Sequence, residues 1–253
     1  MDGLTEAVKK MAIKQGFNSV GITRTEDLED LEYGWVYDVR ELKRAREILP
    51  NANSVILLTF HVWDPAFMMQ IESPNWKGYS LNTPGENVEG YYIAYQVTQN
   101  KAWPIVSYLR EQGYDAVLTT ETPMKTIGVK CGLGRQGKNT LLVTEQVGPR
   151  VALACIVTSA SLESENSAVR NFCDNCDLCV KACPTGALTP YRIDHMKCLA
   201  YASENPAKTD LDPRIREIER KLVRRASPLS YVECSICMYA CPVGRKKADM
   251  CLS

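Results

Sequence analysis

The stretch Cys173–Pro184, CDNCDLCVKACP, spaces its cysteines as C-x2-C-x2-C-x3-C-P. Bacterial ferredoxins use this spacing to bind iron–sulfur clusters: the first three thiolates bind one [4Fe-4S] cube, and the fourth binds a second cube. The proline turns the chain out of the site. The alternative is a zinc site, but zinc favours paired C-x2-C knuckles that supply four ligands. The run therefore predicts a ferredoxin-like fold with two clusters for this part of the chain.

The second cluster needs further thiolates downstream of the first run. The stretch Cys234–Pro242, CSICMYACP, supplies three of them as C-x2-C-x3-C-P, with Tyr231 where one more cysteine would stand. Cys198, in HMKCLAY, is the natural eighth ligand. The last cysteine of each run binds the other run's cube, and a three-iron cluster in one site is left open. Cluster one then takes Cys173, Cys176, Cys179 and Cys241, and cluster two takes Cys183, Cys198, Cys234 and Cys237.

The cysteines are unevenly distributed along the chain. None of the eleven precedes Cys131, and nine lie in the first run or after it. Disulfides are a poor explanation, because a cytosolic compartment keeps thiols reduced. Cys155 lies in an apolar stretch and is predicted to be a buried core residue, whereas Cys131 and Cys251 receive no ligand role. The acidic, serine-rich segment 161–169 is predicted to be a linker. This gives two domains, 1–165 and 166–253.

The overall charge is balanced, with 30 basic and 30 acidic residues, so it gives no indication of nucleic acid or a membrane surface as a partner. The N-terminal segment 1–16 has a charged, amphipathic pattern rather than that of a signal peptide. No apolar run approaches the roughly 20 residues of a membrane span. We therefore expect a cytoplasmic protein. The charged helix predicted at 214–225 is either a solvated face or a docking site for an acidic electron donor.

Helix-like and strand-like patterns alternate through the first domain. Continuous apolar runs predict buried strands, and glycine or proline ends each helical pattern. Pro104 should kink or split the longest helix. Helices that alternate with apolar strands favour an α/β layer. The predicted helices are 4–15, 41–49, 89–112 and a segment after Pro123, and the predicted strands are 19–23, 54–60, 115–120 and two segments around a Gly148-Pro149 turn.

The stretch Gly132–Thr140, GLGRQGKNT, matches the dinucleotide fingerprint G-x-G-x-x-G. It also matches the phosphate loop G-x-x-x-x-G-K, with Asn139 where a serine or threonine should follow. Both motifs require a strand before the glycines and a helix after them, so that the helix N-terminus meets the phosphate. Here a predicted helix precedes the glycines and apolar strands follow them. A nucleotide site is therefore disfavoured, and a plain loop between helix and strand remains open.

The segment 173–205, followed by the second cysteine run, closely resembles the double-cluster module of epoxyqueuosine reductases and, less closely, that of reductive dehalogenases. The resemblance continues upstream. The segment 131–159, CGLGRQGKNTLLVTEQVGPRVALACIVTS, resembles the part those reductases place beside cobalamin, and 48–60, ILPNANSVILLTF, resembles their early helix-to-strand step. The resemblance covers most of the chain, densely after residue 120 and thinly before it.

This resemblance implies an α+β protein: a nitroreductase-like α/β corrinoid domain followed by the ferredoxin-like domain with two [4Fe-4S] clusters. It also implies a base-off cobalamin that the adjacent cluster reduces to the Co(I) state. Glycines would let the backbone approach the broad corrin ring closely, and polar side chains would bind its amides or its phosphate. The residues implied for cobalamin binding are Gly128, Gly132, Gly134, Gly137, Lys138, Asn139 and Thr140.

Two departures from the family pattern bear on function. The reductases carry a catalytic aspartate shortly before the proline that precedes the glycine loop, whereas LTTETPMK places Thr120 there and Glu121 next to it. Glu121 is therefore the first candidate for a proton donor, and Tyr92 is the second. The reductases also continue into a C-terminal helical-repeat domain that helps to hold tRNA. The sequence ends soon after Pro242 and looks like a short form, without the export signal of respiratory dehalogenases.

Two functions follow from these observations. The first is a cobalamin-dependent reductase that passes low-potential electrons through two clusters to a corrinoid, which then reduces an electrophilic small molecule. The alternative is an electron-transfer or corrinoid-reducing protein with no substrate of its own, and the missing aspartate favours it. The expected partners are a donor such as ferredoxin or flavodoxin and either a small substrate or a corrinoid protein, with nucleic acid and membranes not expected.

Overall fold

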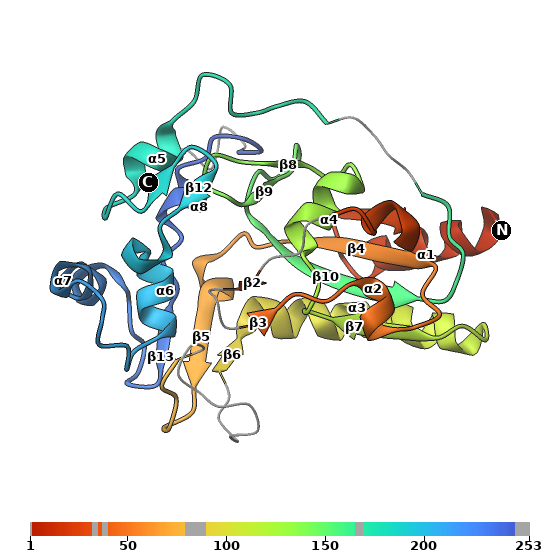
Figure 1. Ribbon diagram of the computed structural model, residues 1–253, viewed down its shortest axis with the longest axis horizontal. Coiled ribbons are helices and arrows are strands. Elements are labelled where there is room, and N and C mark those ends of the chain that lie inside the picture. Colours follow the sequence, from red (N-terminus) through yellow and green to blue (C-terminus); the bar gives the residue numbers. More distant parts are fainter. Residues whose placement is uncertain (1, 32–34, 37–39, 79–89, 165–168, 246–253) are drawn as a thin grey trace.

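The computed structural model describes residues 2–31, 35–36, 40–78, 90–164 and 169–245 (Figure 1). Its centre is a four-stranded sheet in the order β1-β4-β10-β7, in which every neighbouring pair is antiparallel. The two middle strands are buried along almost their whole length, because both are continuous apolar runs. The strands are β1 (Ser19–Arg24), β4 (Ser54–His61), β7 (Ala116–Thr119) and β10 (Val151–Thr158).

Helices cover both faces of this sheet. Ile56, Leu58 and Phe60 of β4 pack with α1 (Asp2–Lys14) and α3 (Ile93–Glu111) in one core cluster. The alternate residues Val55 and Leu57 pack with α2 (Ala45–Ile48) and α4 (Met124–Lys130) in a second cluster. Successive side chains of a strand point to opposite faces, so one apolar strand supplies both clusters. No helix in the described part of the chain is long and apolar enough to cross a bilayer.

Most of the predicted elements are present, with three differences. The helix predicted at 41–49 is helical only in α2, because Arg40–Glu41 form β3 and pair with β2 (Trp35–Val36). The longest helix begins at Ile93 and runs through Pro104 as one element. The two strands predicted around Gly148 do not pair with each other: β9 (Leu142–Val143) pairs with β8 (Arg135–Gln136), and β10 joins the central sheet.

The cysteine-rich region consists of short elements between the cysteines. They enclose a separate small core that includes Leu199, Tyr201, Ile215 and Tyr231. The elements are α5 (Leu178–Ala182), β11 (Leu188–Thr189), β12 (Arg192–Ile193), α6 (Leu199–Glu204), α7 (Pro213–Leu222), β13 (Ser230–Val232) and α8 (Ile236–Tyr239), with one 3-10 turn at His195–Lys197.

The two regions share secondary structure. Strand β13 of the cysteine-rich region pairs with β5 (Met69–Glu72), which pairs with β6 (Gly90–Tyr92) of the first region. Met238 of α8 also belongs to the core cluster of α1 and α3. The predicted domain boundary after residue 165 falls outside the described residues. Lys125 at the start of α4 interacts with Cys237, and Tyr92 at the end of β6 interacts with Glu233, so both elements reach the second cysteine run.

Candidate functional site

The structure brings the eight predicted ligands together in two groups. Burial raises the pKa of the Cys179 thiol, and the nearby Cys173 and Cys241 raise it further. Burial raises the pKa of Cys237 to about 12, and other thiols contribute. The thiols that act on Cys237 include Cys234, Cys198 and Cys183. Cys179 of the first group also acts on Cys237, so the two groups adjoin each other, and the crossed assignment of ligands to two clusters remains a prediction.

Two one-turn helices arrange the crossing. Helix α5 carries Cys179 and ends at Cys183, so one run directs thiols toward both groups. Helix α8 carries Cys237 and precedes Cys241 in the same way. The two helices lie side by side (Figure 1). Among the described residues no three metal-binding side chains converge on one ion-sized point, and a cube does not require this, since each thiolate binds a different iron.

Backbone N–H groups surround the sulfur atoms, as a thiolate ligand requires. Burial opposes ionisation of Cys183, but hydrogen bonds from the Thr185 hydroxyl and from backbone N–H groups outweigh it and lower the pKa. Cys198 stands at the N-terminus of α6, where the N–H groups of Tyr201 and Ala200 favour the thiolate; burial still raises its pKa to about 11. The donor set therefore fits two four-iron clusters.

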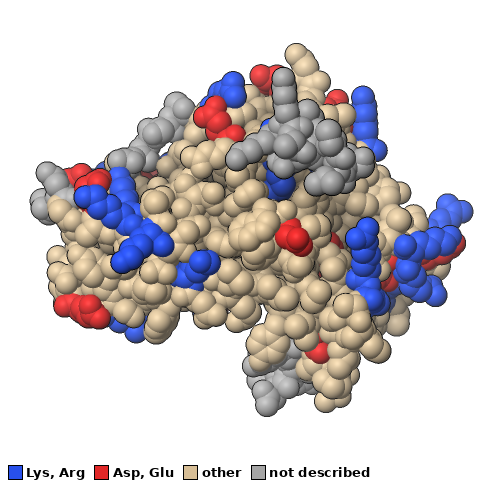
Figure 2. Space-filling model, turned by 180° about the vertical axis from the view of Figure 1, so that it is seen from behind, with Lys and Arg blue, Asp and Glu red and all other residues tan. Residues whose placement is uncertain are grey.

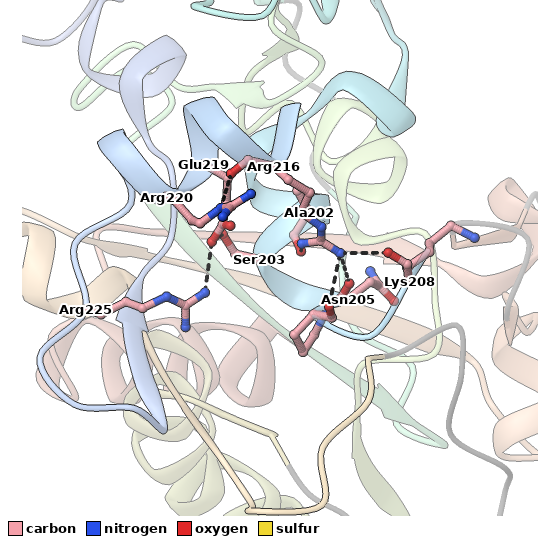
Figure 3. A network of polar contacts seen from close by, with 9 residues as sticks. Ala202, Ser203, Asn205, Lys208, Arg216, Glu219, Arg220 and Arg225 are labelled. Carbon is pink, nitrogen blue, oxygen red and sulfur yellow. Dashed lines mark hydrogen bonds and ion pairs between the residues drawn. The ribbon is translucent and has the colours of Figure 1, made fainter. Parts of the chain in front are cut away.

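A polar network fixes the helix that begins at Cys198 (Figure 3). At the C-terminal end of α6, the Arg216 guanidinium donates to the carbonyls of Ala202 and Asn205, both at 2.5 Å, and to that of Lys208 at 3.2 Å. The Ala202 and Asn205 carbonyls also accept the Asn205 N–H at 3.4 Å and the Lys208 N–H at 3.2 Å, so the arginine adds a second donor to each and ties the end of α6 to the turn that follows it. Beside them, the buried Glu219 accepts hydrogen bonds from Ser203 at 3.2 Å and from Arg225 at 2.8 Å.

The first glycine of the loop, Gly132, terminates α4. Gly132 has a φ of +69°, in the left-handed region that favours glycine. The Leu133 N–H donates to the Gly128 carbonyl at 2.9 Å, and the Gly132 N–H donates to the Val129 carbonyl at 3.1 Å. This pair of bonds is a Schellman motif, which terminates the helix.

The other glycines of the loop allow close packing against β9. A Cβ atom on Gly134 would collide with the carbonyl oxygen of Val143, and one on Gly128 would lie 2.7 Å from Leu142. A Cβ atom on Gly137 would lie 2.6 Å from the side chain of Asn139. These glycines thus face protein atoms. Their predicted contact with cobalamin remains a prediction.

The polar residues of the loop hold both cysteine runs. Lys138 Nζ forms an ion pair with Asp177 Oδ1 at 2.7 Å and donates to the Asp174 carbonyl at 3.3 Å, within the first run. Asn139 Nδ2 donates to the Cys237 carbonyl at 3.4 Å, within the second run. Thr140 has a φ of +64° and closes the turn through its N–H. We predicted these three residues as cobalamin ligands; the structure shows two of them binding the loops that carry the cluster thiols.

The two predicted proton donors lie in different surroundings. Glu121 forms an ion pair with Lys43 at 3.1 Å, its carbonyl accepts the Lys43 N–H, and its side chain is 38 % exposed. Tyr92 instead lies beside Glu233, the residue before Cys234, and its hydroxyl donates to Met68 Sδ at 3.1 Å. Among the described residues, the structure does not bring Glu121 into contact with Tyr92.

A group of ionisable side chains lies next to cluster two. Burial raises the pKa of Glu233 to about 7, although hydrogen bonds with Tyr92 and Gln70 and the charge of Lys125 act in the opposite direction. Burial lowers the pKa of Lys125, while Glu233 and Cys237 favour its cation. The Lys125 side chain is nevertheless exposed. Protein atoms thus desolvate the Lys125 ammonium although its side chain is exposed, and it lies beside the cluster-two thiols; the surface around Lys125, Tyr92 and Glu233 is called the recess below. Neither Glu233 nor Lys125 was predicted, because each contacts residues far away in the sequence.

Comparison with known proteins agrees with this geometry. The family described as 4Fe-4S double cluster binding domain matches residues 172–244, which include all eight thiols. An epoxyqueuosine reductase of Gloeobacter violaceus is 28% identical over 266 residues, which cover 93% of this chain and 74% of that protein. One from Listeria monocytogenes is 32% identical over 128 residues, covering 50% of this chain and 31% of that protein. Over most of its length the chain is thus similar to epoxyqueuosine reductases.

Solved structures show the same fold. The epoxyqueuosine reductase of Streptococcus thermophilus superposes with a TM-score of 0.67 at 18% identity, covering 95% of this chain and 66% of that one. A catabolic reductive dehalogenase superposes with a TM-score of 0.61 at 17% identity, covering 95% of this chain and 32% of that one. The chain is therefore an α+β protein with a double-cluster domain, while the nitroreductase-like description of its first region remains a prediction.

Proposed function

We propose that the protein is a corrinoid-dependent reductase, in which two [4Fe-4S] clusters deliver electrons to a corrin bound in the recess beside cluster two. The observation that carries the proposal is the accessible, desolvated group of Lys125, Tyr92 and Glu233 next to the thiols of Cys198 and Cys237. The similarity to epoxyqueuosine reductases and the fold shared with a protein of B12-dependent dehalogenation support it. A reduced corrinoid, when bound, supplies a strong nucleophile for an electrophilic substrate.

The residues of the recess suit the amide-rich rim of a corrin. Gln70 is 2% exposed, and its Oε1 atom accepts no hydrogen bond from the described atoms. A buried acceptor without a partner is costly, so a ligand amide that donates to it would be favourable. Lys125 supplies donors on the other side of the recess, next to the start of α4. The glycines of the loop would then support this surface from behind rather than line it.

Tyr92 is the proton donor in this proposal, in place of Glu121. Burial, followed by the charge of Glu233, raises the pKa of Tyr92 well above its ordinary value, so the phenol keeps its proton. The hydroxyl is held by its neighbours Met68 and Glu233. Glu121 is engaged by Lys43 instead.

The electron-transfer alternative has one observation in its favour. Thr120 stands where the resemblance places a catalytic aspartate, and the adjacent Glu121 is paired elsewhere. In either function, electrons would arrive from a carrier with an acidic surface, because basic side chains gather at the end of the molecule that carries α7 (Figure 2). The exposed basic residues on or near this helix are Arg214, Arg220, Lys221, Arg224 and Arg225, of which Lys221 pairs with Glu217 at 2.6 Å.

The substrate class remains open between a small electrophile and a modified nucleoside. The balanced charge argues against nucleic acid, but a related epoxyqueuosine reductase has been solved with an epoxyqueuosine-modified tRNA stem loop. We favour the small electrophile and include a modified stem loop in the screen as the competing outcome.

Anaerobic reconstitution with iron, sulfide and cobalamin tests the proposal. The protein should shift the absorption spectrum of added cobalamin to the base-off form, and a reductant with a catalytic carrier should then convert one of the screened electrophiles. Tyr92→Phe should bind cobalamin normally but lose turnover by roughly two orders of magnitude, the typical share of a general acid. Cobalamin whose spectrum does not change while both clusters are intact would rule out the reductase. Spectral change without any turnover would leave the electron-transfer function.

A further inference from the structure

Arg150 is a buried cation between the two regions of the molecule. It lies in the turn between β9 and β10, it is 6% exposed, and its carbonyl accepts the Val62 N–H at 3.0 Å. Its guanidinium crosses to the cysteine-rich region. There Nη1 donates to the Cys241 carbonyl at 3.1 Å and Nη2 donates to the Val243 carbonyl at 2.6 Å. A residue of the α/β region therefore holds the last ligand of cluster one.

The guanidinium is fixed by two backbone segments that interlock. A Cβ atom on Gly148 would collide with the Val243 carbonyl oxygen, and one on Gly244 would lie 2.5 Å from the Cα atom of Val147. Both glycines have positive φ, at 63° and 69°. No side chain at either position fits between the segments, so the turn and the loop meet backbone to backbone. This contact leaves Arg150 little freedom to move away from Cys241.

The charge of Arg150 is permanent, because a guanidinium stays protonated in proteins. The guanidinium lies beside Cys241, whose carbonyl its Nη1 atom binds at 3.1 Å. A cubic cluster with four thiolates is an anion, and it gains a further negative charge when it takes up an electron. Burial of a fixed cation next to it strengthens their attraction, since the interior screens charges less than water does.

Beside cluster two, Lys125 is the cation described above. The Lys125 ammonium there faces the carboxylate of Glu233, and burial lowers its pKa. On the cluster-one side, Lys138 stands beside Cys173 as a second cation, although Asp177 offsets its charge at 2.7 Å. Arg150 is thus the buried cation whose guanidinium binds the backbone of a cluster-one ligand.

We propose that Arg150 raises the reduction potential of cluster one, so that the first electron taken up by the protein resides there before it passes to cluster two. The inference rests on the assignment of Cys241 to cluster one. The step is a one-electron reduction by the low-potential carrier, in which no bond breaks and no proton moves.

Potentiometric titration of the reconstituted protein, followed by electron paramagnetic resonance, tests this without cobalamin or substrate. Arg150→Gln should lower the equilibrium constant for reduction of one cluster at least tenfold, which corresponds to about 59 mV for one electron. Arg150→Lys keeps the charge but cannot reach both carbonyls, so a smaller fall in the same direction is expected. Arg170→Gln is the control, because Arg170 is an exposed arginine paired with Glu145 at 3.2 Å.

The cluster that shifts is identified in a Cys198→Ser background, in which only cluster one should remain. Unchanged potentials in Arg150→Gln, a shift no larger than that of the Arg170 control, or a shift confined to cluster two would each overturn the proposal. If Arg150→Gln loses iron, Arg150→Lys decides: because this variant keeps the charge, a tenfold or larger fall in its equilibrium constant for reduction would also overturn the proposal. Failure of the reductase proposal would leave these potentials as they are, so the two outcomes are separable.

Discussion

The two cluster sites have the same ligand chemistry and different surroundings. Three ligands of cluster one are at most 9% exposed: Cys173, Cys179 and Cys241. Near them, Lys138 pairs with Asp177 and donates to the Asp174 carbonyl, and Arg150 donates to the Cys241 carbonyl. All four ligands of cluster two are partly exposed, and ionisable groups flank them. In the proposed function the two sites have different tasks: cluster one holds an electron, and cluster two adjoins the recess where an electron is used.

Removal of one thiolate ligand should have the largest effect that distinguishes the two sites. Cys198→Ser should remove cluster two and spare cluster one, so that iron falls from about eight to about four atoms per chain. Cys241→Ser should produce the opposite pattern. Iron and sulfide analysis with electron paramagnetic resonance measures both. Retention of both clusters in Cys198→Ser would make the assignment wrong and direct attention to Cys251, which lies outside the described residues.

The helix that carries Cys198 offers the next test. Arg216→Ala should expose the carbonyl groups at the end of α6 and lower the free energy of unfolding by about 3 kcal/mol, because several charge-assisted hydrogen bonds are lost together. Cluster two should become labile while cluster one persists. Denaturant unfolding of the anaerobic protein measures the effect, and Arg224→Ala, an exposed neighbour, is the matched control. Equal effects of the two substitutions would show that the Arg216 network does not stabilise α6 and cluster two.

The stability of the region around cluster two should also depend on pH. The group responsible is Glu72 of β5, which is 8% exposed. Burial, followed by the charge of Glu219, raises its pKa from 4.5 to about 7 against the influence of Arg225. The folded state therefore binds this proton more tightly than the unfolded state, and stability should fall as pH rises from about 4.5 to 7. Glu72→Gln should remove about 1–2 kcal/mol of that fall. A wild-type slope in the variant would contradict this.

The smallest effect concerns the recess. Lys125→Met should weaken cobalamin binding about tenfold, equivalent to the loss of one charge-assisted hydrogen bond. Lys130→Met is the matched control, because Lys130 is exposed at the other end of α4. Spectral titration of the reconstituted protein gives both affinities. If both variants bind cobalamin like the wild type, the corrin does not use this side of the recess.

The cluster ligands could be predicted from the sequence because their geometry is local. Two runs with fixed gaps and a one-turn helix in each determine where most of the thiols point, and only Cys198 had to be assigned by counting. The central strands were equally predictable, since β4 and β10 are continuous apolar runs. Their antiparallel pairing was not, because it depends on which segments meet across the chain.

The contacts around the clusters could not be predicted because they join distant segments. Lys138 and Asn139 look like ligand-binding residues of a glycine loop, but their partners lie 39 and 98 residues away, in the cysteine runs. Glu121 has the pattern of a proton donor in the sequence, but its side chain pairs with Lys43, 78 residues away. Arg150 gave no sequence signal, since a single arginine after a glycine-proline turn resembles any surface residue.

The account makes cluster two, and not cluster one, the neighbour of the corrin, and one measurement tests this directly. Electron paramagnetic resonance spectra of the reduced clusters should be recorded with and without bound cobalamin, with the Cys198→Ser variant used to assign the signal of cluster one. The account predicts that cobalamin alters the signal of cluster two and leaves that of cluster one unchanged. A change confined to cluster one, or identical spectra when cobalamin is bound, would contradict it.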